Sequence, residues 1–162
     1  MTIQVYVGTY AKYNNASIKG EWVDLEDYDT EDAFYERCAE IHADEEDPEF
    51  MFQDFEGFPK DYYGESGLDA EIWEWLELDD DDRELWAAAQ ACFGEISFKN
   101  AQDAFQGQYD SDEEFAQEMA DDCGMLDRDL SWPYTCIDWE WAARELMYDY
   151  SSHDGHYFSS NW

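Results

Sequence analysis

Apolar and polar positions alternate at the start of the chain. Ile3, Val5 and Val7 are each separated by one amphipathic or polar residue, the period of two that is typical of a half-buried strand. The pattern predicts a strand over residues 3–10. The turn-rich connection that follows it predicts a hairpin, with residues 21–25 as the second strand.

The next apolar spacing is helical. Phe34, Cys38 and Ile41 recur at i, i+4 and i+7, so they share one face of a helix that begins at Thr30 or Asp29. This helix is predicted to run to about position 42. An acidic turn marked by a proline follows it, and residues 50–55 are predicted to return to the sheet.

Two short helices are predicted in the middle of the chain, over residues 69–76 and 80–93. Gly94 is predicted to end the second helix in the left-handed αL conformation. Four consecutive aspartates, Asp79 to Asp82, precede its apolar face. Acidic residues in a first turn meet the positive end of the helix dipole, so the run predicts an N-terminal cap, which needs only one or two of them.

The last third of the chain mixes both periods. A strand is predicted over residues 104–109, and Ser111 and Glu114 have the spacing of a capping box for a helix that ends at Gly124. A further helix is predicted over about 138–148, and a closing strand over 156–160. Together these elements predict an α+β fold.

Charge changes this picture more than any motif does. The 162 residues hold 43 Asp and Glu against 8 Lys and Arg, a formal net charge of −35. Such charge is typical of disorder, but 19% of the residues are aromatic, which predicts a folded chain with salt-dependent stability. A polyanion is expected to avoid nucleic acid and anionic membranes and to bind a basic surface of another protein.

The charge is divided almost equally along the chain. Residues 1–60 hold 16 acids and 4 bases, residues 61–103 hold 13 and 2, and residues 104–162 hold 14 and 2. This division predicts an N-terminal α+β subdomain, a central helical subdomain and a C-terminal α+β subdomain with those boundaries. One hypothesis for so much spread-out charge is that the carboxylates imitate phosphates. Duplex DNA carries one charge per ~1.7 Å of its axis, so 35 charges match roughly 60 Å of duplex, a length that favours an elongated molecule.

Other chemistries find little support in the residues. Nucleotide-binding and nucleophile motifs are missing, so we expect neither an enzyme nor a cofactor. His153 and His156 flank Asp-Gly, which predicts a surface turn rather than a metal pair. The acidic runs lack the spacing of an EF-hand, but a low-affinity calcium-binding protein remains an alternative, and a halophilic origin is another explanation of the acidity.

The remaining expectations concern cysteines and location. Cys38, Cys92, Cys123 and Cys136 form no Cys-x-x-Cys pair, and three of them end or line apolar helical faces, which predicts small buried residues. With no leader pattern and no long apolar run, a cytoplasmic location is expected.

Residues 3–25 closely resemble the opening of the ArdA antirestriction proteins, with Val-Tyr-Val, Tyr-Asn-Asn and Gly-x-Trp-Val-Asp-Leu. Residues 104–115 and 137–150 are similar to the middle and end of that family, as are Gly155, Tyr157 and Phe158. The resemblance thus spans essentially the whole chain. It departs at Ala16, where a glycine is expected after the two asparagines.

This resemblance implies a dimeric DNA mimic, carried on mobile genetic elements, that occupies the DNA-binding groove of type I restriction-modification enzymes. It implies inhibition of restriction and, less strongly, of modification. The carboxylates expected to stand in for phosphates are Asp27, Asp29, Glu45, Glu46, Glu71, Glu74, Asp79, Asp80, Asp81, Asp82, Asp112, Glu113, Glu114, Asp121 and Asp122. Phe105 and Tyr109 are candidates for the dimer interface, with packing inside the subdomain as the alternative.

Overall fold

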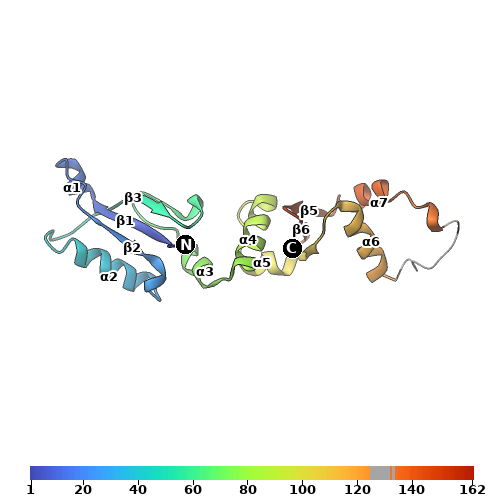
Figure 1. The fold of residues 1–162 in the computed structure, drawn as a ribbon, viewed down its shortest axis with the longest axis horizontal. Helices are drawn as coiled ribbons and strands as arrows, with labels where there is room; N and C mark the ends of the chain where they lie inside the picture. The colour runs from blue at the N-terminus through green and yellow to red at the C-terminus, as the bar shows by residue number, and fades with distance from the viewer. Residues whose placement is uncertain (125–131, 133) are drawn as a thin grey trace. The chain divides into compact units, whose positions relative to one another are not determined.

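The computed structural model describes residues 1–124, 132 and 134–162, and it groups the chain into two compact units, Met1–Leu78 and Asp79–Trp162. Each unit contains one small antiparallel sheet with helices (Figure 1), so the predicted α+β class is confirmed. The finer division into subdomains of 1–60, 61–103 and 104–162 stays a prediction.

The sheet of the first unit has the strand order β2-β1-β3, with β1 at Gln4–Thr9, β2 at Glu21–Asp24 and β3 at Phe50–Glu56. All three predicted strands are therefore present. The end of the first differs from the prediction, because the Thr9 side chain caps a short helix, α1, at Tyr10–Asn14. None of the residues of α1 is buried, so its sequence does not show the helical spacing of apolar residues that would predict it.

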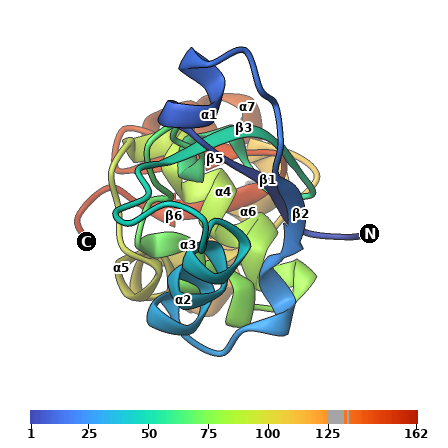
Figure 2. The same cartoon turned by 90° about the vertical axis from the view of Figure 1, so that its left-hand side faces the viewer.

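Helix α2, Glu31–Ile41, lies against one face of this sheet, while α1 projects on the opposite side (Figures 1 and 2). Thr30 caps α2 by accepting a hydrogen bond from the backbone N–H of Ala33 at 3.2 Å. Phe34 and Cys38 are fully buried as predicted, and the Phe34 ring lies 6.0 Å from that of Phe52 on β3. Ile41, predicted on the same face, is half-buried.

Ala16 adopts a positive φ of 59° directly after α1. A residue with a Cβ pays about 1 kcal/mol for this region, which glycine enters freely. The position where the family resemblance predicted glycine is thus one where the backbone favours glycine.

The rest of the first unit consists of two 3₁₀ turns, Leu25–Asp27 and Lys60–Tyr62, and helix α3 at Glu71–Glu77. Aromatic rings fill its interior: Phe55 stacks on Tyr63 at 4.4 Å, and Tyr62 lies 6.0 Å from Trp75. These contacts bury apolar surface, which stabilises the unit against the repulsion among its surface acids.

The second unit begins with α4, Asp80–Phe93, and α5, Phe98–Ala104. Helix α4 was predicted with these bounds, and it buries Leu85, Trp86 and Ala89. The Trp86 indole N–H donates to the Ile96 carbonyl at 2.8 Å. Gly94 ends α4 with φ 77° and ψ −126°, which is outside the predicted αL region. Glycine adopts this conformation without strain, whereas a residue with a Cβ does not. Helix α5 was not predicted.

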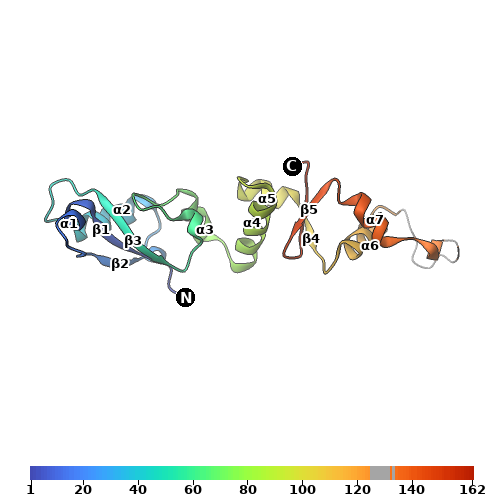
Figure 3. The same ribbon diagram turned by 90° about the horizontal axis from the view of Figure 1, so that it is seen from above.

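The second sheet has the order β4-β6-β5, with β4 at Phe105–Gln108, β5 at Tyr150–His153 and β6 at His156–Ser159 (Figure 3). β4 is shorter than predicted because Ala104 ends α5, and β5 was missed. Helices α6, Asp112–Asp122, and α7, Trp139–Leu146, pack against each other. A 3₁₀ turn at Tyr134–Cys136 precedes α7.

Two predictions about single residues were wrong in part. Cys38 is buried, and burial raises the pKa of its thiol to about 12, but Cys123 and Cys136 are exposed. Asp154 and Gly155 do form the predicted turn, with His153 exposed, yet His156 is only 4% exposed. Its Nε2 accepts a hydrogen bond from the Gln108 amide at 2.7 Å, and its Nδ1 donates one to the Asp154 carbonyl at 3.1 Å.

Candidate functional site

The outstanding surface feature is the carboxylates. Across residues 1–124, 132 and 134–162, no Asp or Glu is buried; the buried polar residues of this part are Thr9, His42 and His156. An ionised carboxylate is costly to remove from water, so acids without a buried partner stay outside. The described carboxylates are therefore exposed or half-buried, and most of them contribute to a negative surface.

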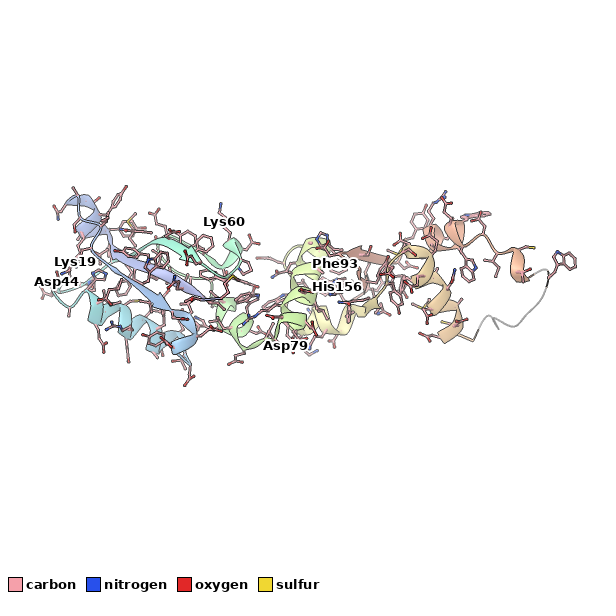
Figure 4. All side chains as sticks on the ribbon, in the orientation of Figure 1. Lys19, Asp44, Lys60, Asp79, Phe93 and His156 are labelled. Carbon is pink, nitrogen blue, oxygen red and sulfur yellow. The ribbon has the colours of Figure 1, made fainter. Side chains whose placement is uncertain are left out.

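The aspartate run at the start of α4 divides into one capping residue and a charged surplus. Asp79 (Figure 4) accepts a hydrogen bond from the backbone N–H of Asp82 at 2.9 Å, which confirms the predicted cap. Asp80 and Asp81 are exposed, and the Asp80 carboxylate, 98% exposed, lies 3.8 Å from Arg83. These two acids interact favourably with the helix dipole, but neither is the N-cap residue.

The acids at the start of α6 carry more of the local structure. Ser111 accepts from the backbone N–H of Glu114 at 3.1 Å, and the Glu114 carboxylate accepts from the N–H of Asp110 at 2.8 Å. The Tyr157 hydroxyl donates to Asp112 at 2.6 Å. Burial, and then this hydrogen bond to Asp112, raises the pKa of Tyr157. The predicted capping box is thus present, except that the Glu114 carboxylate binds the N–H of Asp110 instead of that of the capping residue Ser111.

The other end of α6 places acids where they oppose helix stability. Asp121 and Asp122 lie in its last turn, which contains no basic residue. There they meet the negative end of the helix dipole, at a cost of about 0.3–1 kcal/mol each. The helix dipole gives no reason for these two charges.

In the first unit, most predicted acids lie on the surface. Asp27, Asp29, Glu46, Glu71 and Glu74 are all exposed. Glu71 and Glu74 stand in the first turn of α3, at the favourable end of its dipole.

Glu45 differs from these acids because it faces inward. Its side chain is 18% exposed, and it accepts hydrogen bonds from the Thr9 hydroxyl at 2.7 Å and from the Lys12 ammonium at 3.1 Å. Lys12 also bonds Asp44 at 2.9 Å and the His42 Nδ1 at 2.9 Å. We call Thr9, Lys12, His42, Asp44 and Glu45 the inner cluster. In it, the charge of Glu45 is paired within the fold.

The inner cluster determines the tautomer of His42. Its Nε2 lies 3.0 Å from the Val7 carbonyl, which can only accept, so Nε2 carries the proton. Nδ1 is then the acceptor for Lys12. The ring thereby ties α2 to β1 through one backbone bond.

Hydrogen bonding shifts the pKa values of the cluster. The bond from Thr9, followed by that from Lys12, lowers the pKa of Glu45, and the bond from Lys12 lowers that of Asp44. Desolvation alone would lower the pKa of Lys12, but its bonds to Asp44 and Glu45 outweigh it and raise that pKa. All three groups are therefore held in their charged forms.

Basic residues neutralise only a small part of the surface. Described ion pairs join Arg37 to Glu21 at 3.0 Å and to Glu40 at 3.3 Å, Lys99 to Asp103 at 2.7 Å, and Arg144 to Glu140 at 3.4 Å. Lys19 lies near Asp44 (Figure 4), and its charge contributes to the lowered pKa of that acid. With 8 bases for 43 acids, most carboxylates face other carboxylates or solvent.

Phe105 and Tyr109 are both half-buried and pack inside the second unit. The Phe105 ring lies 5.7 Å from that of Phe158, and the Tyr109 ring lies 5.1 Å from Phe115 and 5.5 Å from Tyr157. These contacts correspond to the packing alternative. A role of these residues in a dimer interface stays a prediction.

The sequence reading missed three acids that the structure brings together. Asp24, Asp54 and Glu56 lie on the face of the first sheet that is turned away from α2. The available signal was the alternation along the strands, which places acids two residues apart on the same face.

In the part of the chain that is described, no group of three or more His, Cys, Asp or Glu is arranged to hold a metal ion. None of the helices there combines the length and apolar character needed to cross a membrane.

Comparison with protein families gave a match that covers most of the chain. The family model described as "Antirestriction protein (ArdA)" matches residues 5–159. This chain belongs to the ArdA antirestriction family. A search of curated proteins found no match.

The ArdA match runs through both compact units, so it includes the aspartate run of α4 and the inner cluster alike. ArdA proteins are antirestriction proteins, which are inhibitors rather than enzymes and act against restriction-modification systems. The resemblance noted in the sequence is thereby confirmed.

Proposed function

We propose that this ArdA chain inhibits type I restriction-modification enzymes as a DNA mimic. Its carboxylates would occupy the DNA-binding groove of the enzyme in place of phosphates, blocking restriction and, less strongly, modification. The observation that carries this proposal is that no described acid is buried and most are exposed, including Asp122, which opposes the dipole of α6.

The proposed inhibition is stoichiometric and competitive. Lys and Arg residues of the groove would meet many carboxylates at once, and the net charge of −35 would steer the encounter and make it fast and salt-sensitive. A homodimer would double the length of the imitated duplex. The elongated arrangement and the dimer are both predictions.

The experiment is restriction of unmodified DNA by a purified type I enzyme, titrated with this protein. Inhibition that saturates at a fixed ratio to enzyme and is relieved by excess duplex supports the mimic. Absence of inhibition across several type I enzymes would overturn it. Saturable calcium binding in moderate potassium chloride would then favour the calcium-binding alternative.

The attraction is expected to be distributed over many acids. Replacing Asp80 alone by Asn should change the inhibitory concentration by no more than about fivefold, because one exposed ion pair is worth only ~0.2–1 kcal/mol. A block variant should lose at least about tenfold by the same reasoning. It replaces exposed acids by Asn or Gln at Asp27, Asp29, Glu46, Glu71, Glu74, Asp80, Asp81 and Asp122. A large loss from Asp80→Asn alone would contradict the distributed mechanism.

A further inference from the structure

The sheet of the first unit has one face packed against α2 and one outer face. Val5, Val7 and Val23 point into the core, so the alternate residues of the same strands point outward. The outward residues form two rows across the three strands: Trp22, Tyr6 and Asp54 in one row, and Asp24, Gln4 and Glu56 in the other. We call these six residues the outer array.

The spacing of the outer array follows from sheet geometry. Residues opposite each other in a row have Cβ atoms about 5 Å apart, and the two rows are separated by about 7 Å along the strands. Two aromatic rings and three carboxylates therefore lie within a patch of about 10 by 7 Å, and a partner's side chain can contact neighbouring members of it. A register shift after Tyr6 brings Asp54 rather than Gln53 opposite that ring.

The aromatic pair of the outer array is held in place. The rings of Tyr6 and Trp22 meet edge to face, with centroids 5.5 Å apart at 73°. The Tyr6 hydroxyl donates to the Ile18 carbonyl at 2.8 Å, which holds the ring from the other side. Trp22 nevertheless remains 41% exposed, so part of its indole is open to a partner.

Each carboxylate of the array is also oriented by one hydrogen bond. Asp24 accepts from the backbone N–H of Glu26 at 3.0 Å, and Asp54 accepts from that of Phe55 at 2.9 Å. Glu56 accepts from the Gln4 amide at 2.8 Å. Groups fixed before binding lose little conformational entropy when a partner arrives.

We propose that the outer array binds an arginine side chain on the basic surface of the partner, an inference that relies on the proposed function for the identity of that partner. A guanidinium is planar, so it can stack on an indole face while its fork of N–H donors binds carboxylates. A lysine ammonium also attracts carboxylates, but it acts as a compact point charge without a planar face. The array contains both kinds of group and no base of its own. Arg37, the base on α2, is engaged by Glu21 and Glu40.

This site gives the acidic surface a selectivity that a plain phosphate array lacks. A row of exposed carboxylates attracts lysine and arginine alike. Trp22, with Asp24 next to it on the same face of β2, favours arginine, because stacking adds to the charge attraction. The array therefore determines which basic residue of the partner lies against the first unit.

The test follows the indole N–H resonance of Trp22 in the full-length protein. Its assignment comes from its loss in Trp22→Phe. Six-residue peptides of arginine or of lysine are titrated at matched ionic strength. The arginine peptide is expected to shift this resonance with an apparent Kd about threefold lower than the lysine peptide. Equal affinities, or shifts confined to other tryptophans, would overturn the site.

Three variants separate stacking from charge and from apolar area. Trp22→Leu keeps an apolar group but no π face, so it should abolish the arginine preference, measured at the Tyr6 ring resonances. Ile18→Ala removes a neighbouring side chain that is 73% exposed and should preserve the preference. Asp54→Asn should weaken both peptides equally. Circular dichroism confirms that each variant is folded, and a preference retained in Trp22→Leu would contradict the proposal.

A parallel titration of the type I enzyme separates this site from the proposed function. If the protein inhibits the enzyme and Trp22→Leu inhibits about threefold less well, both stand. If the wild-type protein fails to inhibit but still prefers the arginine peptide at Trp22, only the function is wrong. If it inhibits without any such preference, only the site is wrong.

Discussion

The inner cluster of the first unit and the aspartate run of the second use the same chemical group in opposite ways. Glu45 is 18% exposed and has two hydrogen-bond partners, whereas Asp80 is 98% exposed. Both lie in strongly acidic stretches of similar appearance. The comparison teaches that an acidic run does not by itself reveal which carboxylate is paired inside the fold: Glu45 is paired because long-range packing brings donors to it.

The largest expected effect is the loss of the inner carboxylate. Glu45→Ala leaves the Thr9 hydroxyl, which is fully buried, without its acceptor and should lower the free energy of unfolding by about 2 kcal/mol. Glu46→Ala, at the exposed neighbour, should change it by less than about 0.5 kcal/mol. Urea unfolding of both variants measures the difference, and equal losses would refute the inward role of Glu45.

Acid pH should remove part of the same stabilisation. Because the pKa values of Asp44 and Glu45 are lowered in the folded state, their contribution is complete above the ordinary values of 3.8 and 4.5 and is lost as pH falls through the folded pKa values. Glu45→Gln still offers an oxygen to Thr9 but cannot titrate. Between pH 7 and pH 3, the urea midpoint of the wild type should therefore fall relative to that of Glu45→Gln; parallel profiles would argue against this linkage.

A smaller effect is expected at the cap of α4. Asp79→Ala removes the acceptor for the Asp82 N–H and should cost about 1 kcal/mol. Asp79→Ser keeps a capping oxygen without the charge and should retain most of the stability. Thermal unfolding distinguishes the cap from the charge, since a loss in both variants would mean that the charge itself is needed.

The smallest effect is expected at Asp81, which is exposed within the same run. Asp81→Asn should leave the free energy of unfolding within about 0.5 kcal/mol of the wild type. A gain rather than a loss is compatible with this, because the substitution also relieves repulsion from the neighbouring aspartates. Destabilisation as large as that of Asp79→Ala would show that Asp81 also supports the helix.

Local patterns predicted much of the fold. The cap at Asp79, the bounds of α4 and the buried positions Phe34 and Cys38 depend on residues within a few positions of one another, so their spacing carries the information. The short elements α1, α5 and β5 were missed. β5 has no buried residue, and a strand of this kind exists because β6 pairs with it.

The sequence predicted that the candidate site consists of many acids, but not how each acid is placed. Sequence grouped Glu45 with Asp80 as surface acids, because each lies in an acidic run. It could not foresee that Glu45 meets a threonine 36 positions earlier, nor that Ala16 has a positive φ. It also passed over Asp54, whose position beside Tyr6 depends on a register shift in the sheet.

The sequence by itself determined the α+β class, the helix cap at Asp79, the excess of surface charge and the membership of the ArdA family. These follow from short-range periodicity, from composition and from long matching segments. The tertiary structure alone decided which carboxylates face inward and which aromatic rings stand beside them. The reason is physical. Pairing of strands that are distant in sequence places donors and rings next to an acid, and no local pattern of residues encodes which distant residues become neighbours.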